Sequence, residues 1–508
     1  MGSEPSADGE APSDSAPDSA PAKQHQQLID VARDGDIILS VTFLTSDATL
    51  RRARKAAAGP PKPPGHTNNN NTNNNNTNNN TNNNTNNDAN NNANTSEPPT
   101  ILAPKLTLAY RVSVAALTKH SKYFANLLTN PSFREAQLIS STHATLAARK
   151  LKVGEADPLD LPWVLITDDD DATQSAGRQH ALEDMLRIMH GLPIKTARLL
   201  MSHMTTLAIT ADRFDCTAVV SRSLAHLKFK WPLTDTRPYL DEAGRPTDVE
   251  KVLRKKILVA WLLNQPMRLH QDTRELLIRG SRLWGAYAED EAGSSSAAWW
   301  HLPQGVEEEL RHRRECILNT ISSIQRHFIA LYSSRDRQCK LGYDSSAACD
   351  SFQFGQMIRF LLSKDLLYMV DYSPASADSL PDTSLIDLDD LLATLKQCPS
   401  YQVDKHHMNC GLRIRIDPIL DYVKAMLAAS VVSIPLADWK RRRGHVSWVS
   451  GVDAGARSRA EDDDEKRVFA FTRALANDQR LRHEGAIYAD RMAKSLFTAN
   501  AWDWTPEV

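Results

Sequence analysis

The fold of the amino-terminal half is decided by the segment DGDIILSVTFL, which occupies residues 34–44. Apolar residues are nearly continuous from Ile37 to Leu44, and the turn signal Asp34-Gly35-Asp36 stands immediately before them. A short apolar run behind such a turn is typical of a buried strand. The segment LTLAYRVS at residues 106–113 alternates in the manner of a second strand. We therefore predict two strands that pair as a hairpin.

An Asn-rich insertion separates these two strands. Of the 27 residues from Asn68 to Asn94, 20 are Asn, so the segment has almost no apolar side chains with which to build a core. Because loop-closure entropy grows only slowly with length, such a segment costs little at a hairpin tip. We therefore expect a disordered insertion at about residues 45–104, with a linker between two domains as the alternative. Residues 1–29 are also expected to be disordered.

Deletion of residues 60–98 tests the interpretation of the insertion. Since the tract should bury nothing, we expect the shortened protein to unfold at the same temperature as the full chain. Thermal unfolding followed by circular dichroism measures this directly. A clear loss of stability would mean that the tract packs against the folded part of the chain.

Helical periodicity dominates the rest of the sequence, where apolar residues recur every three or four positions. A third strand is predicted at Leu161–Thr167, and the acidic run Asp168–Asp171 after it is expected to be a solvated loop. The fold class is therefore α+β: a small sheet with helices, followed by a mostly α-helical region. The helical stretches are predicted at about 114–128, 181–189, 200–214, 219–227, 249–261, 273–283, 317–331, 354–361, 385–395, 419–426 and 461–495.

The composition excludes several classes of protein. Lys and Arg number 60 and Asp and Glu number 62, whereas a protein that binds a phosphate backbone needs a basic surplus. Six Cys in 508 residues are too few for a disulfide scaffold and fit a reducing compartment. Neither a signal peptide nor a run of about 18 apolar residues is found. We therefore expect an intracellular protein, cytoplasmic or nuclear, that binds neither nucleic acid nor membranes.

Four segments, in their order along the chain, resemble those of a BTB/POZ domain. They are Asp34-Gly35-Asp36-Ile37, Val112–Phe124, Phe133-Arg134-Glu135-Ala136 and Leu207–Cys216. Through residues 255–263 and 338–344 the chain is also similar to the large BTB-domain proteins of filamentous fungi, which carry a long helical extension. The resemblance implies a BTB/POZ-like domain at 30–232, a helical carboxy-terminal domain at 245–449 and a helical tail at 460–508.

The resemblance implies a protein–protein interaction module. Many BTB domains dimerise, and some bind a cullin scaffold and present substrates for ubiquitylation. Cullin-binding members carry an apolar residue, any residue and then Glu after the third core helix, and Phe133-Arg134-Glu135 fits that pattern. Phe133 and Glu135 are therefore candidate partner-binding residues. The alternative is that Phe133 packs on its own domain and Glu135 is solvated. The insertion lies near the place where BTB domains pair, which puts self-association in doubt.

No catalytic motif accompanies this resemblance. The sequence has no phosphate-binding glycine loop, dinucleotide glycine fingerprint, zinc-protease helix or nucleophile elbow. We therefore expect a non-enzymatic adaptor or scaffold without a cofactor. The most specific version of this expectation is that the protein is a substrate adaptor of a cullin ubiquitin ligase. The alternative is a BTB-type transcriptional or chromatin regulator, for which the chain offers two short basic runs, Arg51–Lys55 and Lys440–Arg443.

The cysteine and histidine residues of the second half are the candidates for a metal site. Cys339 and Cys349 are ten positions apart, and a second group lies within 13 residues: Cys398, His406, His407 and Cys410. Thiolates and an imidazole that meet at one point give a tetrahedral zinc site. The spacings are not the usual short ones, and free Cys is among the most buried residue types. The expectation is therefore buried thiols and no metal. The alternative is a metal held by residues among Cys339, Cys349, Cys398, His406 and Cys410.

Overall fold

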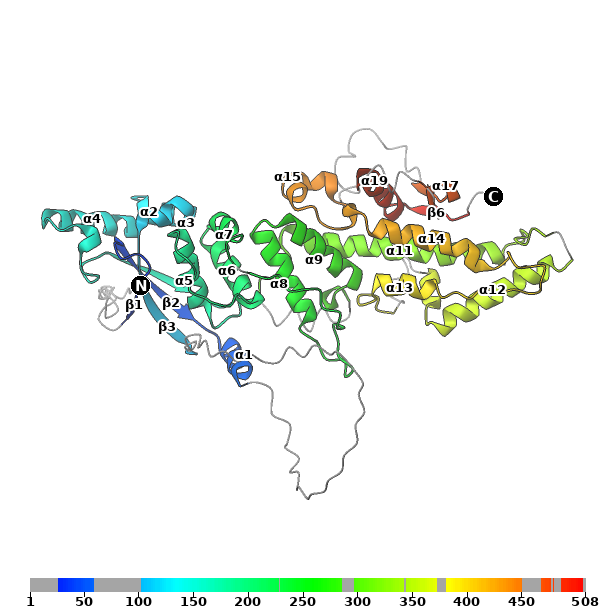
Figure 1. Cartoon of the computed structure of the whole chain (residues 1–508), viewed down its shortest axis with the longest axis horizontal. Helices are drawn as coiled ribbons and strands as arrows, with labels where there is room; N and C mark the ends of the chain where they lie inside the picture. Colours follow the sequence, from blue (N-terminus) through cyan, green and yellow to red (C-terminus); the bar gives the residue numbers. More distant parts are fainter. Residues whose placement is uncertain are drawn as a thin grey trace, which may run out of the picture. The chain divides into compact units, whose positions relative to one another are not determined.

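The computed structural model describes residues 26–58, 102–227, 229–285, 297–341, 344–371, 381–449, 467–476, 478 and 486–505. The fold is mixed α/β and mostly helical, and a small four-stranded sheet lies near the amino terminus (Figure 1). This confirms the predicted combination of a small sheet with a mostly helical region. The described residues form two compact units. The first contains those up to Asp170 together with Leu186–Ile194, and the second contains Asp171–Met185 and those from Lys195 onward.

The first unit is built on the sheet, whose strand order is β1-β3-β2-β4. β2 and β3 pair in antiparallel fashion, with Ile37 opposite Val112 and Leu44 opposite Lys105, and β4 lies parallel to β2. The predicted pairing and the predicted third strand are thus confirmed. The elements of this unit are β1 (Gln27–Asp30), β2 (Ile37–Leu44), α1 (Asp47–Ala57), β3 (Lys105–Val112), α2 (Val114–His120), α3 (Lys122–Thr129), α4 (Arg134–Ala148) and β4 (Trp163–Asp168).

The turn before β2 joins the strand pair to the helix that follows β3. A side chain at Gly35 would lie 2.8 Å from the carbonyl oxygen of Val112, so only glycine fits there without movement of the backbone. Asp36 Oδ1 accepts a hydrogen bond of 2.8 Å from the N–H of Val114 at the start of α2. The buried Arg111 donates to the carbonyl oxygens of Gly35, Gly154 and Ala156 at 3.0–3.2 Å. Through these contacts, the segment Asp34-Gly35-Asp36 connects β2 to the end of β3 and to the start of α2.

Two segments that were expected to be disordered are regular elements. β1 begins within the segment that was expected to be disordered and pairs in parallel with β3, so the expectation for residues 1–29 was wrong at residues 27–29. α1 lies within the expected insertion at 45–104. Its first turn is capped by Ser46, whose hydroxyl accepts from the N–H of Thr49 at 3.4 Å. The Asn tract itself, residues 68–94, lies outside the described residues.

The acidic run after β4 takes part in this cap. Asp170 is 4% exposed and receives hydrogen bonds from the N–H of Ser46 at 3.1 Å and from its hydroxyl at 2.8 Å. The expectation of a solvated acidic loop was therefore wrong for Asp170. The helix predicted from Val114 to Leu128 is also divided in two. Ser121 ends α2 and caps α3, since its hydroxyl accepts from the N–H of Phe124 at 2.9 Å.

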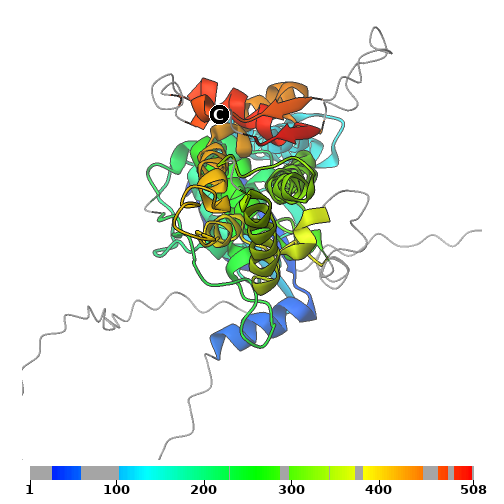
Figure 2. The ribbon, with the colours of Figure 1, turned by 90° about the vertical axis from the view of Figure 1, so that its right-hand side faces the viewer.

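The second unit is a bundle around the 28-residue helix α11. In Figure 2, α11, α12 and α14 are seen nearly end-on, and the carboxy-terminal elements lie beside them. Among the helices that the structure describes, none combines the length and apolarity needed to cross a bilayer. The other elements are α6 (Met201–Arg213), α7 (Thr217–Ser223), α8 (Val249–Leu262), α9 (Pro266–Arg279), α11 (Val306–Ser333), α12 (Ser346–Ser363), α13 (Leu388–Leu395), α14 (Leu412–Leu427), α15 (Leu436–Val446), β5 (Val468–Ala470), α17 (Arg473–Ala476), α19 (Ala486–Phe497) and β6 (Ala501–Asp503); α5 (Arg178–Met189) crosses the boundary between the units.

The expected helical tail at 460–508 contains two short strands. β5 pairs in parallel with β6, and α19 lies between them in sequence. Phe469 and Phe471 lie on the buried side and contact the rings of Tyr422 and Trp504. Alternate burial in this segment follows the period of a strand, so the continuous helix predicted there was wrong. The charged run at 461–465 lies outside the described residues.

Candidate metal centre and partner-binding residues

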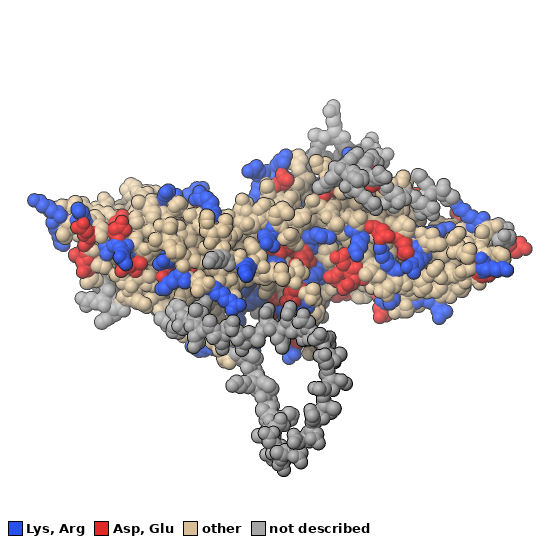
Figure 3. Space-filling model, in the orientation of Figure 1, with Lys and Arg blue, Asp and Glu red and all other residues tan. Residues whose placement is uncertain are grey.

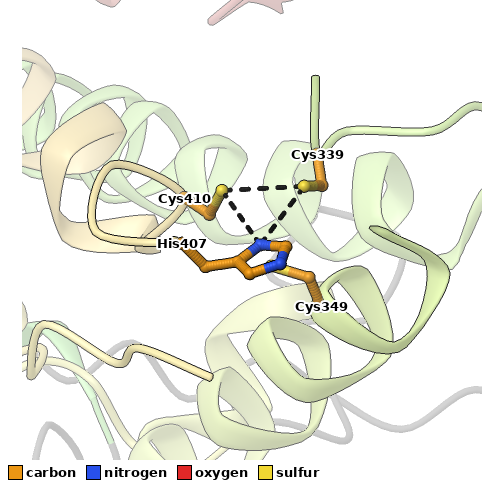
Figure 4. A group of neighbouring side chains, drawn as sticks. All are labelled: Cys339, Cys349, His407 and Cys410. Atoms are coloured by element: carbon orange, nitrogen blue, oxygen red, sulfur yellow. Dashed lines mark hydrogen bonds between the residues drawn. The ribbon is translucent and has the colours of Figure 1, made fainter. Parts of the chain in front are cut away.

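Three thiols and one imidazole meet at one point in the second unit. The side chains are those of Cys339, Cys349, His407 and Cys410, and their possible ligand atoms all lie within 4.8 Å of one another (Figure 4). Cys339 Sγ is 3.7 Å from Cys410 Sγ and 3.4 Å from His407 Nδ1, and Cys410 Sγ is 3.6 Å from the same nitrogen. The first three side chains are buried, with Cys349 and His407 at 0% exposure.

Three separate segments of the chain supply these side chains. Cys339 lies in the loop that follows α11, and Cys349 lies in the first turn of α12. His407 and Cys410 lie in the turn that precedes α14, where the N–H of Cys410 donates to the carbonyl oxygen of His407 at 3.2 Å. Two residues separate this pair, which is the spacing that puts two side chains on the same side of a tight turn.

Hydrogen bonds outside the cluster hold each segment in place. Asp350 in α12 accepts from the N–H groups of Gln338 and Cys339 at 2.8 and 2.9 Å. Arg415 in α14 donates to the carbonyl oxygen of Gln338 at 3.0 Å, so the loop is tied to two helices. Gln353 of α12 donates to the carbonyl oxygen of Tyr401 at 3.0 Å. These contacts help to position the segments that carry the thiols without involving sulfur.

The imidazole of His407 presents one nitrogen to the sulfurs and the other to Ser345. Its Nε2 lies 3.1 Å from Ser345 Oγ, and its Nδ1 faces Cys339 and Cys410. Asp404 Oδ1 accepts from the N–H of His407 at 3.2 Å and orders the turn. If Nε2 carries the hydrogen and donates to Ser345, the lone pair of Nδ1 points at the two sulfurs.

The three thiols cannot all ionise without a compensating cation. Burial, together with the charge of the Cys410 and Cys339 thiolates, raises the pKa of the Cys349 thiol to about 12. A divalent cation removes this obstacle because it neutralises the thiolates directly. The pKa of Cys339, in contrast, lies below its ordinary value because hydrogen bonds to its sulfur outweigh the effect of burial, so the thiols of the cluster differ in how readily they ionise.

The structure separates the sequence candidates into two groups. Cys339, Cys349 and Cys410 are brought together, whereas Cys398 is buried elsewhere, with its sulfur 3.9 Å from the carbonyl oxygen of Pro399. His407 replaces His406, which is exposed. The signal that favours His407 is its distance of two intervening residues from Cys410.

The candidate partner-binding residues lie in the first unit. Phe133 is 42% exposed and stands directly before α4, and Glu135 lies in the first turn of that helix. A carboxylate in the first turn interacts favourably with the helix dipole. Tyr123 of α3 is 39% exposed, and burial, with the charge of Glu135 as the second cause, raises the pKa of its phenol. The Phe133 ring is thus partly covered by its own chain and partly open, and the role of Phe133 and Glu135 in partner binding stays a prediction.

Comparisons of the chain with protein-family profiles, with curated proteins and with solved structures return no match.

Proposed function

We propose that the protein is a non-enzymatic adaptor or scaffold in which residues 30–232 form a BTB/POZ-like interaction module. The element order supports this proposal. The antiparallel strands β2 and β3, with α1 between them in sequence, are followed by the three helices α2, α3 and α4, then by β4, which lies parallel to β2, and then by α5 and α6. The DGD segment and the segment around Ser121, which carry the resemblance, each have a structural role in this arrangement.

The observation that carries the cullin-binding form of the proposal is the exposure of Phe133. An aromatic ring that remains 42% exposed on a folded unit is a suitable anchor for a pocket on a partner. Glu135 follows it at a distance of two residues and is partly exposed. An aromatic anchor beside a carboxylate combines apolar burial with a charged contact that fixes register.

The distribution of charge supports protein partners over a polyanion. On the face that Figure 3 shows, basic and acidic side chains lie interspersed over the helical elements. Exposed i,i+4 ion pairs among the described residues include Arg311 with Glu315 and Arg413 with Asp417. A nucleic acid is attracted by a continuous basic surface, which pairs of this kind break up.

Binding of a cullin amino-terminal domain tests this form of the proposal. We expect the wild-type protein to bind with a micromolar or lower dissociation constant. The double variant Phe133→Ala, Glu135→Lys should weaken binding on the order of thirtyfold, because it removes the anchor and reverses the charge. Biolayer interferometry with the full chain measures both values.

A matched double variant, Leu159→Ala with Glu155→Lys, controls for the change in surface. It removes an exposed apolar side chain and reverses an exposed charge elsewhere in the same unit, and it should bind as the wild type does. Absence of cullin binding by the wild type at micromolar concentration would reject the cullin-adaptor form. The scaffold proposal would then depend on partners recovered through the helical unit.

A further inference from the structure

We propose that Cys339, Cys349, His407 and Cys410 form a structural zinc site that ties the loop after α11, the start of α12 and the turn before α14 together. The proposal is independent of the function proposed above, because it concerns the second unit alone. The ligands would be three thiolate sulfurs and His407 Nδ1, a donor set that suits zinc.

The separations between the ligand atoms are those of a tetrahedron around one zinc ion. With Zn–S bonds of about 2.3 Å and Zn–N bonds of about 2.0–2.1 Å, two sulfurs lie about 3.8 Å apart and a sulfur and a nitrogen about 3.6 Å apart. The observed distances are 3.7 Å between the sulfurs of Cys339 and Cys410, and 3.4 and 3.6 Å from these sulfurs to His407 Nδ1. Three edges of the tetrahedron are therefore already in place.

The fourth corner is Cys349. Its Sγ lies within 4.8 Å of the other three ligand atoms, so a movement of about one bond length completes the tetrahedron. Because all separations fall within this limit, the set suits one central ion. In a cluster of two irons, by contrast, ligands on different metal atoms stand farther apart.

Four protein ligands leave no open position, which is typical of a structural rather than a catalytic zinc site. The outer contacts also have the form expected around a metal. Ser345 holds the nitrogen of His407 that is not a ligand, and Asp350 holds the backbone on which Cys339 lies. Removal of the metal should therefore loosen three segments at once.

The metal content of the native chain is the primary test. The full-length protein is purified without a polyhistidine tag and analysed by inductively coupled plasma mass spectrometry. We expect close to one zinc per chain and no stoichiometric iron. A content below about 0.2 zinc per chain, in protein whose thiols are all reduced, would overturn the proposal.

Counting thiols in denaturant distinguishes a zinc site with reduced cysteines from a disulfide between two of them. The chain has six Cys, all of them free in the structure, and six reactive thiols are expected once zinc is released. A disulfide between Cys339 and Cys410, whose sulfurs are 3.7 Å apart, would give four. Four thiols without zinc would overturn the proposal. Six thiols with one zinc support it.

Matched single variants assign the ligands. Cys349→Ser and His407→Ala should reduce zinc to background, whereas Cys398→Ser and His406→Ala should retain one equivalent, because these neighbours lie outside the cluster. His407→Cys should retain zinc in a four-thiolate site. Its zinc content would show that His407→Ala loses zinc because a ligand is missing and not because the protein is misfolded. Retention of full zinc by His407→Ala together with Cys349→Ser would overturn the assignment.

Cobalt replacement provides a readout that needs no variant. Zinc is removed from the wild-type chain with a chelator under reducing conditions, and Co²⁺ is then added to the zinc-free chain. Tetrahedral thiolate ligation produces intense visible absorption and a sulfur-to-cobalt charge-transfer band, both of which should disappear when excess Zn²⁺ is added. Weak octahedral absorption alone would contradict a site of three sulfurs and one nitrogen.

Discussion

Replacement of Arg254 by Met is expected to lower the free energy of unfolding by about 3–5 kcal/mol. Arg254 in α8 is fully buried, and its five N–H groups have five acceptors. These are Glu250 Oε1 at 3.0 Å, both carboxylate oxygens of Glu307 at 2.8 Å, the carbonyl oxygen of Trp300 at 3.0 Å and Ser281 Oγ at 2.6 Å. Met has a similar volume but leaves two carboxylates with too little positive charge in an apolar environment.

A second cation, Arg282, explains why the expected loss of unfolding free energy is not larger. Arg282 donates to Glu250 Oε2 at 2.9 Å and keeps that carboxylate partly neutralised. Burial alone would raise the pKa of Glu250, but Arg254 and the other groups around it hold the pKa below its ordinary value. Urea unfolding of the full chain, followed by tryptophan fluorescence, measures the change as a shift of the transition midpoint.

Two further variants sharpen this test. Arg254→Lys keeps the charge but places three N–H groups on one atom, which cannot reach acceptors arranged around a planar guanidinium, so most of the loss should remain. Arg413→Met removes an exposed i,i+4 ion pair with Asp417 and should change stability by less than about 0.5 kcal/mol. Equal midpoints for Arg254→Met and Arg413→Met would show that the buried network contributes nothing.

The spacing of apolar residues along the sequence was sufficient to predict the strand pair and most helices. The apolar stripe Leu253, Ile257 and Trp261 predicts α8, and the alternation after residue 106 predicts β3. Periodicity did not predict which polar side chains are buried in a helix that is covered on more than one side. The same α8 carries Glu250 and Arg254, which a one-sided amphipathic helix would present to solvent. They are buried because partners 32 and 53 positions away in sequence come to meet them.

The metal centre was only partly predictable for a similar reason. The pair His407 and Cys410 has a recognisable short spacing, because both ligands belong to one turn. The other pair, Cys339 and Cys349, has no such spacing, because a loop and the first turn of a helix supply its members. Cys339 and Cys410 are 71 positions apart, and it is the tertiary fold that brings their sulfurs to 3.7 Å from each other.

Replacement of Arg313 by Met should destabilise the second unit by about 3–5 kcal/mol at neutral pH. Arg313 in α11 is buried and donates to Glu309 Oε1 at 2.7 Å. Its guanidinium also donates to the carbonyl oxygens of Val431 at 2.8 Å, Ser433 at 2.7 Å and Val446 at 2.8 Å. The variant leaves the buried Glu309 carboxylate without its cationic partner and removes the donor from the three carbonyl oxygens. Arg311, two residues earlier on the same helix, is exposed beside Glu315, so Arg311→Met should cost less than about 0.5 kcal/mol.

The carboxylate of Glu309 makes this loss depend on pH. Burial alone would raise the pKa of Glu309, but Arg313, the hydroxyl of Ser447 and the N–H of Trp448 lower it below its ordinary value of 4.5. A pKa that is lower in the folded state than in the unfolded state contributes stability that is present above the unfolded value. That stability is lost as the pH falls through the folded value.

In Arg313→Met the main opposite charge is gone, so protonation of Glu309 relieves the unpaired carboxylate. At the same time, acid removes the benefit of the pair from the wild type. We therefore expect the difference in unfolding free energy between Arg313→Met and the wild type to shrink as the pH falls from 7 to about 4. Urea unfolding of both proteins and of Arg311→Met at intervals over this range measures the trend. A difference that stays constant with pH would assign the loss to packing and to the carbonyl contacts, since those do not titrate.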